Sequence, residues 1–424
     1  MPASPSTARA INDRLALRLL QEEGPLTAGQ LKQLTGLSRP TVADLVDRLT
    51  ASGLITVVGE AGEQRRGPNA RLYGIVADRA HLAALDVRTD GVSVVVTDLV
   101  GRMLAEASVP IVGETGTGPV VEQAVALVER TAKEAGVAGA PQGKGTRAWG
   151  RLHTVGIGAP GLIDPATGEL RDSSGLPEWH RRLVAALQDR FPEARVSVGN
   201  EANLAALAEQ RDGAARDRDT FVLLWLSHGT GAAVVLDGAL RRGASGGTGE
   251  IGFLPVPGTA GLPSATDCDG GFHSLAGSAA IVELAAEHGL AIADAAEQPA
   301  AAGVVRGAAR TATATDTATA TATDTDTARV ADPGRFLDAL ADRLAVGVAS
   351  VVAILDPGCV VLGGEVGQAG GEELARRVAE RVRRMTPLGT EVRPSTLGGG
   401  AVLRGALLTA RDRAQEELFA PPER

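Results

Sequence analysis

The first 50 residues place hydrophobic side chains at helical spacing in three successive segments. The first segment, 11–20, ends before the helix-breaking pair Gly24–Pro25, and the second begins at Thr27, a predicted N-cap. Ser38 caps the third segment, and Pro40 lies in its first turn. The third helix is expected to bury one stripe of its surface, made up of Val42, Leu45, Val46 and Leu49.

Residues 54–76 change this pattern to two strands around a turn rich in glycine and arginine. Three helices followed by such a hairpin predict a winged helix-turn-helix domain over residues 1–77, in which the third helix enters the DNA major groove by its N-terminal end. The residues predicted to contact DNA are Ser38, Arg39 and Thr41 on that helix and Arg65 and Arg66 in the wing. The alternative is a three-helix bundle whose hairpin contacts proteins, and the wing arginines favour DNA.

From residue 80 the pattern becomes that of an α/β protein. Residues 81–111 alternate as three strands with short turns, and a helix follows at 119–133. A similar meander of strands and glycine-rich turns returns at 221–252, again followed by helices. Two similar halves of this kind predict a two-lobed α/β fold with a cleft between the lobes.

The stretch 296–332 is of low complexity, because Thr, Ala and Asp repeat through most of it. It offers no apolar face that could be buried, so we expect a disordered surface insertion there.

Charge and composition narrow the classes of function. The net charge is −9, yet residues 1–77 carry nine Lys and Arg against seven Asp and Glu, whereas the remainder carries 33 against 44. If the chain binds DNA, the first 77 residues are therefore the part that does so. Two cysteines, no basic-then-apolar start and no apolar run of about 20 residues predict a cytoplasmic protein without a membrane partner.

Several long motifs of the second part resemble the ROK family, named for its repressors, open reading frames and sugar kinases. The resemblance covers about residues 80–290 and 335–410 and implies an actin-like, ribonuclease-H-like fold. The motifs stand in the family's order: "GIGAPGLID" (156–164), "GNEANLAALAE" (199–209), "HGTGAAVVLDGALRRGASGGTGEIG" (228–252), "ILDPGCVVLGGEVG" (354–367) and "LGGGAVLRGA" (397–406). Repressors of that family begin with a winged helix, as this chain is predicted to do.

The chain departs from the family's kinases where those enzymes handle phosphate. Their first strand ends in Asp-x-Gly-Gly-Thr, which lets the backbone approach ATP; here Arg88 and Thr89 replace the glycines and the carboxylate of Asp90 follows. Glu201 stands where the kinases have a catalytic Asp, one methylene too long for its place. Together these changes predict that the chain is not an enzyme and needs no cofactor.

The family's zinc motif is also altered. Phe253 replaces the zinc-binding His, and Cys268 is the one thiol in the following loop, too few ligands for a tetrahedral site. We therefore expect no metal and an incidental role for Cys268.

The sugar-contacting positions of the family are retained in part. The resemblance implies that Asn200, Glu201 and Glu250 hydrogen-bond sugar hydroxyls, and His273 stands where a Glu does so. A structural role in its glycine-rich turn is the alternative for Glu250. Glu178, in place of a usual Gly, is expected to narrow or charge the pocket.

These features predict a sugar-responsive transcriptional regulator, most simply a repressor, whose partners are a double-stranded DNA operator and a small sugar or sugar derivative. A homodimer or homotetramer is expected, because cleft closure could then change the spacing of two DNA-binding heads. Two alternatives remain: an active ATP-dependent ROK sugar kinase with an appended head, and a DNA-binding protein whose second part only dimerises.

Overall fold

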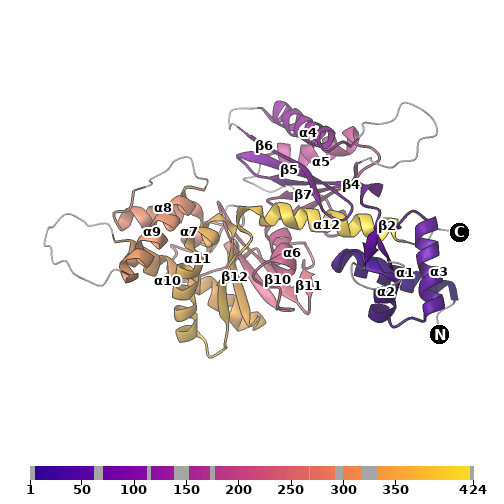
Figure 1. Ribbon diagram of the computed structural model, residues 1–424. Helices are drawn as coiled ribbons and strands as arrows, with labels where there is room; N and C mark the ends of the chain where they lie inside the picture. Colours follow the sequence, from indigo (N-terminus) through magenta and orange to yellow (C-terminus); the bar gives the residue numbers. More distant parts are fainter. Residues whose placement is uncertain are drawn as a thin grey trace.

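The computed structural model describes residues 5–61, 70–111, 116–137, 152–171, 177–266, 268–291, 299–317 and 332–420. Figure 1 shows a small N-terminal unit beside a larger body whose sheets form two lobes. The fold is thus α/β with two lobes, as predicted. No helix in the described stretches has the length and apolar character needed to cross a membrane.

The N-terminal unit is a winged helix. Its helices are α1 (Pro5–Glu22), α2 (Ala28–Thr35) and α3 (Arg39–Ala51), and its sheet has the order β1 (Leu26–Thr27), β3 (Ala70–Ile75), β2 (Ile55–Ala61). Thr27 caps α2 in a capping box with Gln30, and Ser38 caps α3, as the sequence predicts. The four stripe residues of α3 that were predicted to be inward are all buried.

The first lobe is a five-stranded sheet with the order β6-β5-β4-β7-β8. Strands β4 (His81–Val87), β5 (Gly91–Asp98) and β6 (Met103–Pro110) form an antiparallel meander, and β7 (Leu152–Ala159) and β8 (Arg195–Asn200) add in parallel beside β4. A short 3-10 turn, η1 (Ala77–Arg79), leads into β4. The outer face is covered by α4 (Thr117–Glu134) and α5 (Trp179–Arg190).

The second lobe repeats this topology in the order β11-β10-β9-β12-β13. Its strands are β9 (Phe221–Leu226), β10 (Thr230–Leu236), β11 (Ala239–Arg241), β12 (Cys359–Gly363) and β13 (Glu391–Pro394), with β12 and β13 parallel to β9. Its outer helices are α7 (His273–Ala276), α8 (Ser278–Glu287), α9 (Ala300–Thr317), α10 (Pro333–Leu355) and α11 (Gly364–Met385), and η2 (Ile251–Phe253) precedes them. The internal duplication expected from the sequence is therefore present in the strand order of both sheets.

Two helices, α6 (Glu201–Asp212) and α12 (Ala401–Leu418), pack between the sheets, with η3 (Gly398–Gly400) leading into α12. Their small side chains allow close approach: a Cβ on Gly405 of α12 would lie 2.0 Å from the carbonyl oxygen of Leu204 on α6. This middle layer joins the lobes into one continuous core, to which Phe221 and Leu82 contribute from opposite sheets.

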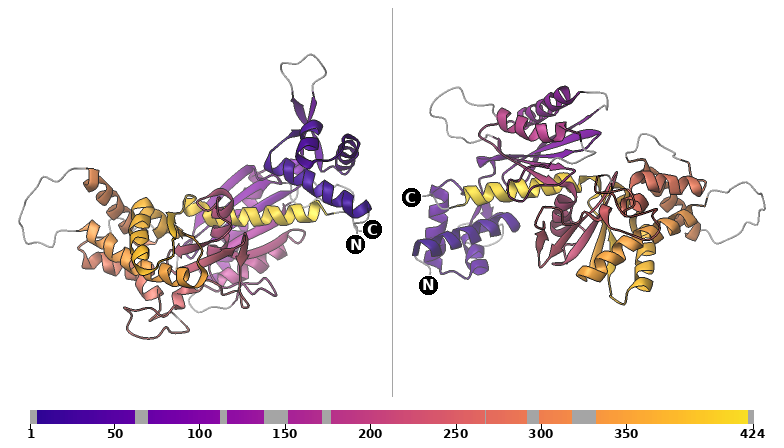
Figure 2. Two further views of the ribbon diagram at one scale, coloured as in Figure 1. Left: turned by 90° about the horizontal axis from the view of Figure 1, so that it is seen from below. Right: turned by 180° about the vertical axis from the view of Figure 1, so that it is seen from behind.

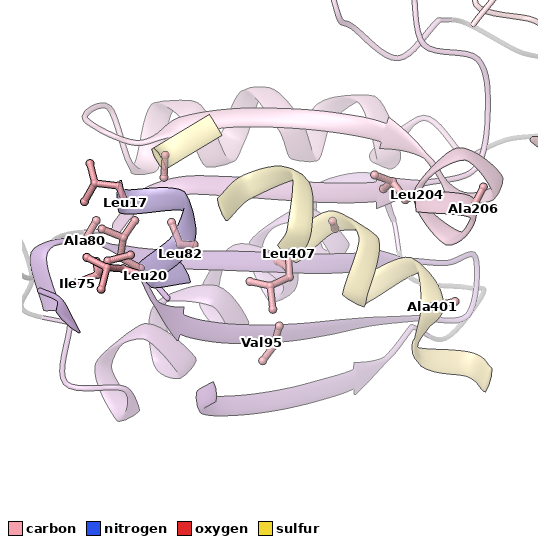
Figure 3. Packing of buried hydrophobic residues seen from close by; sticks show 14 of the residues in the cluster. Leu17, Leu20, Ile75, Ala80, Leu82, Val95, Leu204, Ala206, Ala401 and Leu407 are labelled. Carbon is pink, nitrogen blue, oxygen red and sulfur yellow. The ribbon is translucent and has the colours of Figure 1, made fainter. Parts of the chain in front are cut away.

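The N-terminal unit packs on the body through the same core. Leu17 and Leu20 of α1 are buried beside Ala80 and Leu82, and Leu407 of α12 lies along the same sheet (Figure 3). Polar contacts join the same elements, since Gln415 of α12 donates to Gln21 Oε1 at 2.8 Å and to the Leu99 carbonyl at 3.2 Å. Helix α12 thus runs from between the lobes to the winged helix, as the two views in Figure 2 also show.

The predicted disorder of residues 296–332 is wrong for the part that the structure describes. Residues 300–317 form α9, which packs against α10 and α11 and enters the core of the second lobe. Small apolar residues recur there at helical spacing and are buried: Ala301, Val304, Val305, Ala308 and Ala312. Residues 318–331, which contain most of the repeat, lie outside the described residues.

Candidate effector cleft and DNA-reading helix

A cavity of about 860 Å³ lies between the two lobes. Its walls come from both sheets and from the N-terminus of α6. All four residues predicted to contact a sugar line it: Asn200, Glu201, Glu250 and His273. The structure therefore brings together side chains that are up to 73 positions apart in the sequence.

Asn200 and Glu201 lie where β8 ends and α6 begins. The Asn200 side chain caps the helix by accepting from the Asn203 amide at 3.1 Å and donates to the Gly161 carbonyl at 3.0 Å. Its orientation is thereby fixed at the cavity wall. Burial raises the pKa of the neighbouring Glu201 carboxyl to about 7, with a further contribution from the charge of Asp86. Near neutral pH this carboxyl can both donate and accept a hydrogen bond, which suits a hydroxyl ligand.

Glu250 is held at the opposite wall by a tight glycine-rich loop. Gly249 has φ of +92°, its carbonyl accepts from the Ala232 amide at 2.7 Å, and a Cβ there would lie 1.9 Å from the Ala232 carbonyl oxygen. Partial burial raises the pKa of the Glu250 carboxyl, although the side chain is open to solvent from the cavity.

His273 begins the short helix α7 and is half-buried in the cavity wall. Burial lowers the pKa of its imidazole, and the nearby charge of Asp269 opposes that shift only in part. A neutral imidazole offers one donor and one acceptor. Phe253 and Cys268, from the altered zinc motif, line the same side of the cavity.

A cluster of charged groups around Arg88, which was not predicted from the sequence, lies at the cavity wall. Arg88, just after β4, donates from Nε and Nη2 to Asp86 Oδ2 at 3.0 and 2.9 Å. The same guanidinium forms an ion pair with Glu365 at the start of α11 and donates from Nη2 to the Gly399 carbonyl at 3.2 Å. Arg88 therefore joins the first lobe to α11 of the second lobe and to η3, which leads into α12.

The burial of this cluster shifts the pKa values of its charged groups. Burial raises the pKa of the Asp86 carboxyl, and the adjacent Arg88 charge opposes the shift. Glu365 is also largely buried, with a side chain 12% exposed, so Arg88 is its charge partner in a poorly solvated position. The departure at residues 88 and 89 was recognisable in the sequence. Its pairing with Glu365, 277 positions away, was not.

The expectation for Glu178 is wrong. Among the described residues that line the cavity Glu178 is absent; its side chain is 55% exposed and pairs with Arg182 one turn later on α5, at 3.2 Å. Glu178 therefore neither narrows nor charges this cavity.

The predicted DNA-contacting residues of α3 lie at its N-terminal end. Ser38 and Arg39 are exposed, and the Thr41 hydroxyl lies 2.7 Å from the Ser38 hydroxyl. Farther along α3, Arg48 pairs with Asp13 of α1 at 2.5 Å and so holds α3 against α1. Arg65 and Arg66 lie outside the described residues.

Known families match both parts of the chain. The ROK family profile matches residues 142–413, and that of the MarR family matches residues 11–67. The N-acetylglucosamine repressor of Escherichia coli O157:H7 is 26% identical over 256 residues, as is the DNA-binding transcriptional dual regulator NagC of strain K12. The alignment covers 58% of this chain and 58% of the relative, so the chain spans less than two thirds of the curated relative that it matches.

Solved structures show the same architecture. The ROK hexokinase of Thermus thermophilus is 28% identical with a TM-score of 0.58, covering 79% of this chain and 99% of that one. A ROK family transcriptional regulator described as a homologue of the E. coli MLC protein has a TM-score of 0.70 at 20% identity, covering 97% of this chain and 98% of that one, which supports the fold. ROK kinases are thus among the structural neighbours of a chain whose named relatives include repressors. From residue 142 to 413 the profile spans more than half of the sequence, and the chain belongs to the ROK family, with a MarR-type winged helix at its N-terminus.

Proposed function

We propose that this chain is a sugar-responsive transcriptional regulator, a repressor, that binds an operator through residues 1–77 and senses a carbohydrate through residues 80–424. The observation that carries the proposal is the combination of a winged helix with a kinase-like cavity. Arg88, which replaces a phosphate-binding glycine of the kinases, lines that cavity and is paired with Asp86 and Glu365. The cavity keeps donors and acceptors suited to hydroxyl groups, and the N-terminal unit presents an exposed helix end suited to the major groove.

Sugar contacts in this proposal come from Asn200, Glu201, Glu250 and His273. Their amide, carboxyl and imidazole groups supply fixed donors and acceptors from both lobes, so a bound sugar would favour the closed arrangement. On the DNA side, Arg39 and Thr41 would read base edges from the start of α3. Arg65 and Arg66 would contact the phosphates or the minor groove.

Coupling between the two sites would run through α12. One end of this helix follows the Gly399 carbonyl that Arg88 holds, and the other end contacts α1 through Gln415 and Gln21. A change in lobe closure would therefore shift the surface on which the N-terminal unit packs. In a homodimer, where DNA half-sites repeat about every 34–36 Å, such a shift would change the distance between two reading helices.

The chain would act without transferring phosphate. In place of the flexible backbone turn that approaches ATP phosphates stand Arg88 and Thr89, with a buried carboxylate on either side of the guanidinium. Active sugar phosphorylation is the second candidate, because Glu201 lines the cavity beside Asn200 and its pKa of about 7 is that of a usable general base.

Two measurements on the full chain separate these functions. A coupled ATPase assay over a panel of hexoses, pentoses and N-acetylated amino sugars should give no sugar-dependent turnover, whereas rates of about 1 s⁻¹ or more would establish the kinase. Genomic fragments selected by the protein should be bound tightly without sugar and released by one member of the panel. Arg39→Ala is the control for specific binding, and a protein that selects no fragment, or whose fragments ignore every sugar, contradicts the proposal.

A further inference from the structure

The charges around the cavity indicate which class of carbohydrate it accepts. Among the described residues that line it, Arg88 is the single Lys or Arg, whereas Glu201 and Glu250 both carry carboxyl groups. Asp86 and Glu365 add two further carboxylates in direct contact with Arg88. Acidic groups thus outnumber basic ones at this site.

Arg88 has little capacity left for a ligand. A guanidinium has five N–H donors. Nε and Nη2 donate to Asp86, Nη2 also donates to the Gly399 carbonyl, and Nη1 faces Glu365. Three of the five donors are therefore hydrogen-bonded within the protein, Nη1 lies against Glu365, and the positive charge is already matched by two carboxylates.

Two helices, α6 and α11, begin close to Arg88, and each has a carboxylate in its first turn, where a helix N-terminus would otherwise stabilise a bound anion. Helix α6 starts with Glu201, and Glu365 is the second residue of α11. The partial positive charge of a helix N-terminus favours one anionic group, and these side chains occupy that position already. An incoming phosphate would meet the negative charge of Glu365 and, above its pKa of about 7, that of Glu201 in a partly buried site.

We propose that the cleft selects carbohydrates that carry no phosphate, neutral or amine-bearing, and that the Arg88 cluster excludes sugar phosphates and nucleotides. The inference rests on the proposed sensing function and defines its ligand class. Arg88, held by Asp86, Glu365 and the Gly399 carbonyl, also links the lobes where a ligand's phosphate would otherwise link them. A neutral sugar can then hydrogen-bond to the other polar residues of the cavity wall without displacing a charged group.

Matched ligand pairs test the proposal by isothermal titration calorimetry on the full chain. Glucose, glucosamine and N-acetylglucosamine would each be compared with their 6-phosphates, together with the release of bound DNA fragments. For any pair that binds, we expect the phosphate to raise Kd by about tenfold or more, on the Coulomb energy of a dianion near two carboxylates. A 6-phosphate that binds as tightly as its parent overturns the inference, and if it also releases DNA the sensing function stands. If neither kind of ligand binds or acts on DNA, the sensing function falls.

A second arm needs no sugar. Glu365→Gln leaves one acceptor of Arg88 uncharged, so inorganic pyrophosphate should bind this variant about tenfold more tightly than the wild type. Glu372→Gln, an exposed change on the same helix, is the matched control and should leave pyrophosphate binding unchanged. Thermal unfolding checks that both variants fold. Tight pyrophosphate binding by the wild type, or no gain in Glu365→Gln, contradicts the role given to the Arg88 cluster.

Discussion

Replacing Glu201 with Gln should make the stability of the protein less dependent on pH. Burial, with the neighbouring Asp86 charge, raises the pKa of this carboxyl from an ordinary 4.5 to about 7. Below pH 4.5 the carboxyl is protonated in both the folded and unfolded chain, so no difference arises there. As pH rises from 4.5 to 7 the unfolded chain loses this proton first, which lowers the stability of the folded chain until the folded carboxyl also ionises.

The size of the effect follows from the two pKa values. A difference of about 2.5 at about 1.4 kcal/mol per pH unit gives up to about 3 kcal/mol of stability that the wild type loses by pH 7 and Glu201→Gln keeps. Urea unfolding at pH 5, 6, 7 and 8, followed by tryptophan fluorescence, measures the difference between the two proteins. Glu287→Gln, which removes an exposed carboxylate on α8, is the control. A difference between wild type and Glu201→Gln that stays constant from pH 5 to pH 8 would refute the reasoning.

Three further substitutions test other parts of the account. Arg39→Ala should reduce binding to the selected fragment by about 1–3 kcal/mol and leave non-specific DNA binding nearly unchanged in anisotropy titrations; an equal loss on all sequences would contradict base contact. Gly249→Ala should lower the free energy of unfolding in urea by about 3 kcal/mol or more, because φ is +92° and the new Cβ would lie 1.9 Å from the Ala232 carbonyl oxygen. An unfolding midpoint equal to that of the wild type would be inconsistent with the loop geometry. Leu17→Ala should lower stability by about 2–5 kcal/mol because Leu17 is fully buried between the winged helix and the body, whereas Leu34→Ala, at a side chain 51% exposed, should change it little.

Regular periodicity made most of the fold predictable. The buried stripe of α3 and its cap Ser38 follow from helical spacing and from the need to satisfy the first amides of a helix. The strand order of the lobes follows from two meanders with similar glycine-rich turns. The place of Asn200 and Glu201 in the cavity wall was predictable because a strand ends there and a helix begins.

Features without a strong local sequence pattern could not be predicted. The repetitive composition around 300–317 gave no recognisable apolar face. Its Ala and Val side chains are small, and they are buried because α10 and α11 pack against them. Glu365 of the second lobe pairs with Arg88 of the first, and no local pattern links residues so far apart in the sequence. The ion pair between Arg48 of α3 and Asp13 of α1 also joins two helices that no local pattern links.

The most direct test of the account is a sugar titration of the protein bound to its selected DNA fragment, followed by fluorescence anisotropy. The wild type should release the fragment as an unphosphorylated sugar is added. Glu250→Gln, which changes one carboxyl proposed to contact the sugar, should bind the DNA equally well and need at least about tenfold more sugar for release. DNA affinity that does not change with sugar in the wild type, or an identical response in the variant, would contradict the claim that this cavity controls DNA binding.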